Sequence, residues 1–144
     1  MDANVVGVGY EGLDVDGLLS RLQLRSVATV VDVRLNPISR KRGMSKNALR
    51  DRLLAGGIGY EHLPALGNPR ENRDGFSEVA GSTAQAARDT YDALLTTDAA
   101  AVALSRVLEL AEAGTVALLC FGKDETRCHR QRVLAALRSR LVSV

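Results

Sequence analysis

Short apolar runs rich in β-branched residues alternate along this chain with longer stretches of helical periodicity. The runs lie at residues 5–10, 28–33, 58–62 and 116–120. Parallel strands joined by helices fit this order, because each crossover needs about a dozen residues or more and packs a helix on one face of the sheet. The sequence therefore predicts an α/β fold with three layers, α/β/α, around a mainly parallel sheet of about four or five strands.

The intervening helices are predicted from apolar residues spaced three or four apart and from end signals. A first helix covers about residues 14–24, a second runs from Ser45 as N-cap to Gly56 and Gly57, and the Ala-rich residues 83–113 form two helices broken near 96–98. A last helix closes the chain. The apolar faces carry Leu18, Leu19, Leu22, Leu49, Leu53, Leu54, Val133, Leu134, Leu137 and Leu141.

Composition limits the class of protein. The 144 residues are 46% hydrophobic and 25% charged, which is normal for one soluble domain, here residues 1–144. The net charge of +2 argues against a protein that coats nucleic acid. No secretory signal and no apolar stretch of ~18 residues is present, so we expect a cytoplasmic protein that does not enter a membrane.

Arginine dominates the basic residues, with 16 of the 19 cationic side chains. Guanidinium groups bind carboxylate or phosphate bidentately, in a way that lysine does not. Parallel sheets bind ligands beyond the carboxyl ends of their strands. The candidate site residues that fall at this edge are Tyr10, Glu11, Asp32, Arg34, Ser39, Arg40, Tyr60, His62, Cys120, Cys128, His129 and Arg130.

Four of these residues are candidates for catalysis: Asp32, His62, Cys120 and Cys128. His62 is a candidate general acid or base, with Asp32 or Glu61 orienting its ring. Asp32 has a second interpretation, because residues two apart on a strand point to one face and it would pair with Arg34.

Cys128 stands near the start of the last helix, where free amides, Arg127 and Arg130 would lower the pKa of its thiol and make it a nucleophile. The same amides and arginines would equally bind a phosphate or carboxylate beside a passive cysteine. Two cysteines in a reducing compartment are expected as free thiols, and Cys120 is either buried and inert or a redox partner of Cys128.

The remaining candidates are assigned to substrate binding. They are Tyr10, Glu11, Arg34, Ser39, Arg40, Tyr60, Arg70, His129 and Arg130. Arginines would bind the charge, and the tyrosines would stack on a ring for about 1–3 kcal/mol per base. The aperiodic residues 64–82 are either a lid that brings Arg70, Arg73 and Phe76 over the site or a plain surface excursion.

Metal and cofactor sites are not expected. Cys120, Cys128, either histidine and Asp32 are adequate zinc ligands by chemistry, but no CxxC or HxxxH spacing accompanies them. Gly7, Gly9 and Gly12 match the G-x-G-x-x-G spacing, yet Glu11 places an acid where a pyrophosphate would lie. We therefore predict no cofactor.

Several of these segments, in this order, resemble the bacterial and archaeal family called domain of unknown function 488. The landmarks are Gly7-Val8-Gly9-Tyr10-Glu11-Gly12, Asp32-Val33-Arg34 with Pro37 and Ser39-Arg40, Gly59-Tyr60-Glu61-His62-Leu63-Pro64, Leu66-Gly67, and Leu119-Cys120 with Cys128-His129-Arg130. The resemblance runs from about residue 5 to residue 137 and implies a fold and a set of positions, but no reaction. It departs at Gly122, where members usually carry Glu, so any role of that acid is absent or has moved to Asp124 or Glu125.

Three functions follow as hypotheses. The first is an enzyme, a hydrolase or transferase, that acts on an anionic and nucleotide-like substrate with a Cys/His/Asp site. The second is a non-catalytic module that binds nucleotides or nucleic acid. The third is a redox sensor built on the two cysteines. The sequence does not determine the oligomeric state.

Overall fold

The core of the protein is one parallel sheet of four strands in the order β1-β4-β2-β3. The computed structural model describes residues 4–142, and the side chains of residues 4–140. The strands are β1 (Val5–Gly9), β2 (Val27–Asp32), β3 (Gly59–His62) and β4 (Thr115–Cys120). The predicted α/β class and parallel sheet are confirmed.

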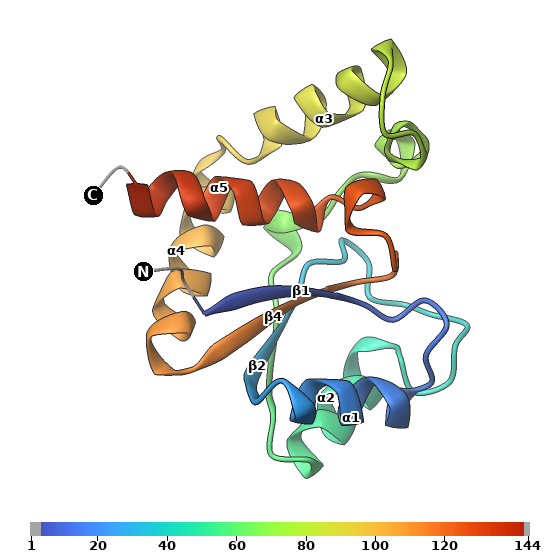
Figure 1. The fold of residues 1–144 in the computed structure, drawn as a ribbon, viewed down its shortest axis with the longest axis vertical. Coiled ribbons are helices and arrows are strands. Elements are labelled where there is room, and N and C mark those ends of the chain that lie inside the picture. The colour runs from blue at the N-terminus through green and yellow to red at the C-terminus, as the bar shows by residue number, and fades with distance from the viewer. Residues whose placement is uncertain (1–3, 143–144) are drawn as a thin grey trace.

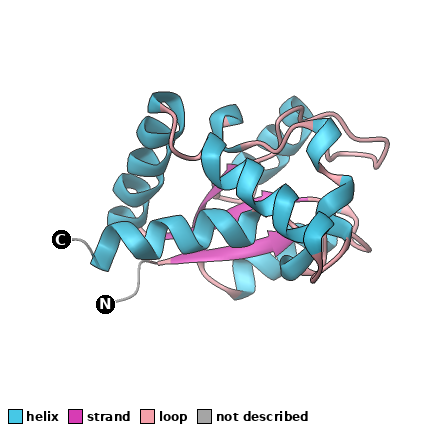
Figure 2. Ribbon diagram, turned by 90° about the horizontal axis from the view of Figure 1, so that it is seen from above, coloured by secondary structure: helices cyan, strands magenta, loops and turns pink. Residues whose placement is uncertain are grey.

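The described residues 4–142 form five α-helices. They are α1 (Val15–Leu24), α2 (Lys46–Ala55), α3 (Ser82–Leu94), α4 (Asp98–Ala113) and α5 (Arg130–Val142). Four of them, α1, α2, α4 and α5, flank the sheet, whereas α3 lies beyond α5 (Figure 1). Helices α1 and α2 pack on one face, and α4 and α5 pack on the other. Figure 2, seen from above, shows helices covering the strands on that second face. The predicted three layers are present.

Strand β4 contributes side chains to both hydrophobic cores, one on each face of the sheet. Its residues from Val116 onward are buried, as in a central parallel strand covered on both faces. Val116 and Leu118 join the core under α4 and α5, whereas Ala117 and Leu119 join the core under α1 and α2. This alternation directs Cys120 to the α5 side of the sheet, where the chain returns at Cys128.

The helix ends and apolar faces agree with the sequence predictions except at two side chains, Ser45 and Leu54. Asp14 caps α1 by accepting a hydrogen bond from the Gly17 amide at 2.7 Å. Ser45 holds the predicted N-cap position of α2, but its hydroxyl donates to the Ser39 carbonyl instead of accepting from the helix. Leu54, predicted on the apolar face, is 56% exposed, because only Leu49 and Leu53 on that helix point into the core. Leu141 lies outside the side chains that the structure describes.

The predicted loop at residues 64–82 contains short 3-10 helices and is held against α3. These helices are η1 (Pro64–Leu66), η2 (Arg70–Asn72) and η3 (Asp74–Ser77), and a fourth, η4 (Glu125–Arg127), precedes α5. The Asn72 amide donates to the Ala87 carbonyl at 2.9 Å, and the Tyr91 hydroxyl donates to the Leu66 carbonyl at 2.5 Å. The segment is therefore a packed part of the domain.

Among residues 4–142, no helix combines the length and the apolar character that crossing a bilayer requires.

Candidate functional site

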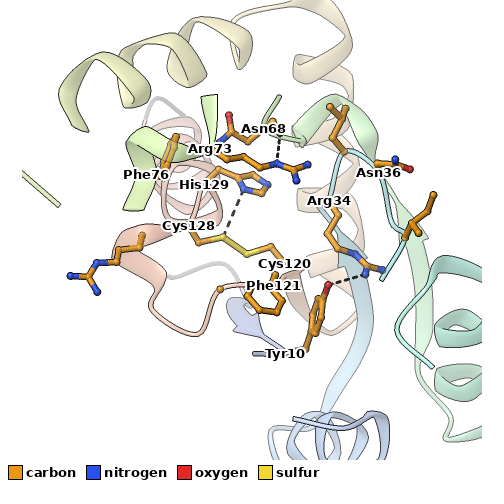
Figure 3. Close-up of a pocket in the computed structure, with 14 residues that line it drawn as sticks. Tyr10, Arg34, Asn36, Asn68, Arg73, Phe76, Cys120, Phe121, Cys128 and His129 are labelled. Atoms are coloured by element: carbon orange, nitrogen blue, oxygen red, sulfur yellow. Dashed lines mark hydrogen bonds between the residues drawn. A yellow bond between two sulfur atoms is a disulfide. The ribbon is translucent and has the colours of Figure 1, made fainter. Parts of the chain in front are cut away.

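A cavity of about 380 Å³ opens beyond the carboxyl ends of β1, β2 and β4 (Figure 3). This is the edge at which the sequence places the candidate residues. The lining residues are Tyr10, Arg34, Leu35, Asn36, Ile38, Asn68, Arg73, Phe76, Cys120, Phe121, Gly122, Arg127, Cys128 and His129.

A disulfide between Cys120 and Cys128 forms part of the cavity wall. Cys120 ends β4, Cys128 follows η4, and the two side chains are 2% and 7% exposed. The expectation of free thiols is wrong for this form of the protein, because strand alternation and the return of the chain into α5 bring the two sulfurs together. Cys128 therefore has no thiol that could ionise in this form. Arg127, predicted to lower the pKa of that thiol, lies 3.8 Å from the carboxylate of Asp124.

His129 lies beside this disulfide with a defined ring orientation. Its Nε2 is 2.7 Å from the Val33 carbonyl, its Nδ1 is 3.8 Å from the Cys128 Sγ, and the ring meets Tyr91 edge-on. A carbonyl oxygen only accepts hydrogen bonds, so Nε2 carries the hydrogen and the Nδ1 lone pair faces the sulfur. Burial, with smaller contributions from Arg73 and Arg130, lowers the pKa of His129 to about 4. The ring is neutral at pH 7.

Arg130 contacts the disulfide but does not belong to the cavity lining. The guanidinium donates to the Cys120 Sγ at 2.8 Å and to the Gly122 and Lys123 carbonyls, and Nε is 3.3 Å from Glu125. Burial lowers its pKa. Arg130 therefore holds the β4–α5 loop, toward which its donors are turned, and its contact with substrate stays a prediction.

The same loop occupies the space beside Gly7 and Gly9. A Cβ atom at Gly9 would lie 1.8 Å from the Gly122 carbonyl oxygen, and one at Gly7 would lie 2.0 Å from Glu125. These glycines therefore admit a segment of the same chain. Close packing against the β4–α5 loop thus explains why glycines stand at positions 7 and 9, which match the dinucleotide-binding spacing.

Asp32 and Arg34 form a buried pair, which is one of the two interpretations of their spacing. Arg34 donates from Nε and Nη2 to the two carboxylate oxygens at 2.8 and 2.6 Å, and the Tyr60 hydroxyl donates to Asp32 at 2.5 Å. Burial opposes the charge of Arg34, but the contacts with Asp32 raise its pKa, whereas burial and Asp32 both raise the pKa of Tyr60. Asp32 is fully buried and does not line the cavity.

Arg34 reaches the cavity with most of its donors already used. Its Nη1 donates to the Met44 carbonyl at 2.7 Å and to the Tyr10 hydroxyl at 3.3 Å, in addition to the two bonds to Asp32. A guanidinium has five N–H groups. Arg34 therefore shapes the wall and holds Tyr10 more than it offers a free anion clamp.

His62 is not oriented as predicted. Its Nε2 lies 2.7 Å from the Arg34 carbonyl, and Glu61 pairs with Arg106 on α4 at 2.6 Å. Neither carboxylate contacts the ring. Asp32 is bonded to Arg34 and Tyr60, and Glu61 points toward α4. His62 also lies outside the cavity lining.

Other predicted binding residues contact the protein around the cavity. The Ser39 amide donates to the Ser45 hydroxyl at 3.0 Å, and Glu11 accepts from the Lys123 amide at 3.0 Å. Arg40 and Arg70 are exposed and do not line the cavity. In the 64–82 segment, the 3-10 turns leave Arg70 outside the cavity lining, whereas the buried Phe76 and the exposed Arg73 both belong to it.

The sequence missed Leu35, Ile38 and Asn68 as lining residues. Asn68 is 3% exposed, and its backbone carbonyl accepts from the Arg73 Nε at 3.3 Å. In the sequence, Asn68 directly follows Leu66 and Gly67, which belong to the segments that carry the resemblance, and this position is the signal that points to it. Leu35 and Ile38 carry no such signal, since apolar residues in a loop have no periodicity to reveal their direction.

The charge of the lining is positive. It contains the three arginines Arg34, Arg73 and Arg127 and no carboxylate. Arg34 is neutralised by Asp32 and Arg127 lies near Asp124, whereas Arg73 forms no ion pair with any residue from 4 to 140. An apolar rim accompanies this charge, formed by Leu35, Ile38 and Phe121, which are 41%, 73% and 52% exposed.

One group of side chains in the lining has the composition of a metal site. Cys120, Cys128 and His129 offer ligand atoms that all lie within 4.8 Å of one another. Sulfur and imidazole nitrogen are ligands that zinc prefers.

Comparison with known proteins gives one match. The family model described as "Domain of unknown function DUF488" matches residues 14–137, which is most of the chain. No curated protein and no solved structure gives a significant match.

Proposed function

Because the chain belongs to the family described as domain of unknown function DUF488, whose description states no reaction, we propose a function from the cavity itself. The cavity binds a small anionic ligand that carries an apolar or flat group, as a nucleotide does. The single observation that carries this proposal is the lining, with three arginines, no carboxylate and an apolar rim.

Arg73 is the main donor for the anion. Its Nε bond to the Asn68 carbonyl leaves the two terminal nitrogens for a ligand, and no acidic group among residues 4–140 competes for them. Arg127 stands at the cavity as a second cation, 3.8 Å from Asp124 and half exposed. A phosphate or carboxylate between these guanidiniums would receive charge-assisted hydrogen bonds.

The rim supports a ligand with a flat part. Phe121 is 52% exposed and meets the buried ring of Tyr10 edge-on, with 5.3 Å between the ring centroids. One face of an exposed aromatic ring is a surface on which a nucleobase stacks. Ile38 and Leu35 add apolar surface beside it. An anion with a base or ring therefore fits better than inorganic phosphate alone.

Acid–base catalysis by Asp32 and His62 has less support than binding. Neither residue lines the cavity, and both side chains are engaged with the protein. The reactive groups at the cavity are Cys120, Cys128 and His129. Hydrolase or transferase chemistry in this protein would therefore depend on the cysteines in their reduced form.

Calorimetric titration tests the binding proposal with AMP, inorganic phosphate and adenosine as probes. At ~50 mM salt, where phosphate contacts are strong, AMP should bind at least about tenfold more tightly than adenosine. Arg73→Gln should weaken AMP binding by about tenfold or more, because a hydrogen bond to a charged group is lost.

Arg138→Gln is the matched control, since Arg138 is exposed on α5 and does not line the cavity. Equal losses in the two variants, or no binding of either AMP or phosphate, would contradict the proposal. Tighter binding of a single-stranded oligonucleotide than of AMP, with a steep salt dependence, would favour the nucleic-acid module instead.

The disulfide favours a second candidate function, reversible redox sensing. Reduction of the protein by a dithiol converts the disulfide into two thiols, and peroxide converts them back with release of two waters. Counting thiols before and after peroxide should show the loss of two per chain. Thiols that persist, or that form bonds only between chains, would remove this candidate. The cytoplasmic location stays a prediction.

A further inference from the structure

We propose that the reduced protein binds one zinc ion through the Sγ atoms of Cys120 and Cys128 and the Nδ1 atom of His129. The fourth coordination position faces the cavity, because all three residues line it. This site goes beyond the anion-binding function and does not depend on it. It also departs from the sequence prediction of no metal.

The ligand atoms have the separations that the proposal needs. All three lie within 4.8 Å of one another, and the His129 Nδ1 is 3.8 Å from the Cys128 Sγ. A nitrogen and a sulfur bound to one tetrahedral zinc stand about 3.6 Å apart, from bond lengths of about 2.0–2.1 and 2.3 Å. The His129–Cys128 pair is therefore already close to the geometry of a metal site.

His129 has the outer contact that metal-bound histidines have. Its Nε2–H donates to the Val33 carbonyl at 2.7 Å, which turns the Nδ1 lone pair toward the sulfurs. Such a bond from the second ring nitrogen to a carbonyl fixes the tautomer and the direction of a ligating imidazole. Tyr91 packs edge-on against the ring and further restricts its rotation.

The backbone also suits two thiolates on one ion. The Cα atoms of Cys120 and Cys128 are 7.5 Å apart, whereas disulfides usually span about 4.4–6.8 Å. Two sulfurs on one tetrahedral zinc stand about 3.8 Å apart, so reduced side chains on this backbone can hold an ion between them. Arg130 donates a hydrogen bond to the Cys120 Sγ at 2.8 Å and orients it from the outer side.

Zinc binding and the disulfide exclude each other. A dithiol reductant transfers two electrons and two protons to the disulfide, forms two cysteine thiols and becomes a disulfide itself. Zinc then displaces one proton from each thiol as two zinc–sulfur bonds form. Oxidation by peroxide restores the sulfur–sulfur bond and releases the ion. The oxidation state of the pair therefore decides whether the metal is held.

Zinc alone is the probe for the first test. The reduced protein, freed of reductant and dialysed against zinc, should retain one zinc per chain, and the oxidised protein none. His129→Ala should weaken binding by at least about tenfold, and each Cys→Ser variant by more. His62→Ala is the matched control, since the His62 Nε2 bonds a backbone carbonyl at the same 2.7 Å but lies away from the cysteines.

Cobalt provides a readout on the unaltered chain, in case a variant fails to fold. Cobalt bound to the reduced protein should show sulfur-to-metal charge-transfer absorption and the intense visible bands of a tetrahedral site. The proposal is overturned if the folded, reduced protein retains no zinc, if cobalt shows no sulfur absorption, or if His62→Ala weakens binding as much as His129→Ala.

Discussion

Two buried arginines near the cavity, Arg34 and Arg130, are held in opposite ways. Arg34 faces the fully buried carboxylate of Asp32 through two hydrogen bonds, and this partner raises its pKa. Arg130 is 2% exposed and donates to backbone carbonyls, to the Cys120 sulfur and to Glu125 at 3.3 Å. Burial outweighs the contribution of Glu125, which is 42% exposed, and lowers the pKa of Arg130. The first site is a pair whose two members are both buried, whereas the second joins a buried arginine to a partly exposed carboxylate.

The two arginines differ in how far a neighbouring carboxylate offsets their charge. A carboxylate at bonding distance cancels the charge of Arg34 and closes Asp32 to any ligand. Glu125 offsets the charge of Arg130 less completely, because it accepts one bond at 3.3 Å and is 42% exposed, while the other acceptors of Arg130 are neutral. Spacing on a strand produced the first arrangement, and the fold of the β4–α5 loop produced the second.

The largest expected effect is at the neutral pair. Asp32→Ala should destabilise the oxidised protein by about 3–5 kcal/mol, because it leaves the buried guanidinium of Arg34 without its partner. Urea unfolding measures this loss. The double variant Asp32→Ala with Arg34→Met should recover part of it, since no charge then remains buried.

Asp16→Ala is the control, because Asp16 forms an exposed pair with Arg52, with the two side chains 74% and 44% exposed. That change should cost no more than about 1 kcal/mol. Similar losses for Asp32→Ala and Asp16→Ala would show that burial of the first pair does not matter, and the contrast with Arg130 would then have no basis.

The next effect is the pH dependence from His129, whose pKa is lowered mainly by burial and to a smaller extent by Arg73 and Arg130. Its pKa is about 4 in the folded protein, below the ordinary value of 6.5, so the unfolded chain binds the proton more readily. Stability should therefore fall as pH decreases from about 6.5 to about 4, by roughly 3 kcal/mol for this group.

His129→Gln keeps a donor for the Val33 carbonyl and removes the titrating ring. The variant should lose less stability than the wild type over the same pH range, and urea unfolding at several pH values measures the difference. Parallel pH profiles for the two proteins would show that burial and the neighbouring arginines do not act on His129.

Removal of Arg130 should have a smaller effect than removal of Asp32. Arg130→Met leaves the carbonyls of Gly122 and Lys123 short of a donor but leaves no buried charge, so we expect a loss of about 1–3 kcal/mol. Calorimetric unfolding of the oxidised protein measures it. A loss equal to that of Asp32→Ala would erase the difference between the two arginines.

The smallest effect is expected at Tyr60, whose hydroxyl donates to Asp32 at 2.5 Å. Tyr60→Phe should cost about 1–2 kcal/mol, because one bond to a charged acceptor is lost while Arg34 still neutralises the carboxylate. Urea unfolding measures the change. No measurable loss would show that Arg34 alone is enough to hold Asp32.

Local patterns predicted the fold well and the site only in part. The strands and the break between α3 and α4 follow from periodicity and end signals within about ten residues. Strand spacing offered the Asp32–Arg34 pair as one of two interpretations, and the structure has the pair. Ser45 holds the predicted N-cap position, although its hydroxyl bonds a loop carbonyl, whereas Leu54 was predicted wrongly because the buried face of its helix is narrower than the apolar pattern.

The sequence by itself determined the α/β class and the edge of the sheet at which the cavity opens, because these depend on short-range spacing. Only the tertiary structure decided between the two interpretations of Asp32 and Arg34, and only it decided the disulfide, the contact of His129 with Val33, which is 96 residues away, and the place of Arg73 in the cavity lining. Such contacts depend on how loops close over the sheet, and loop conformation has no periodicity in the sequence to predict it.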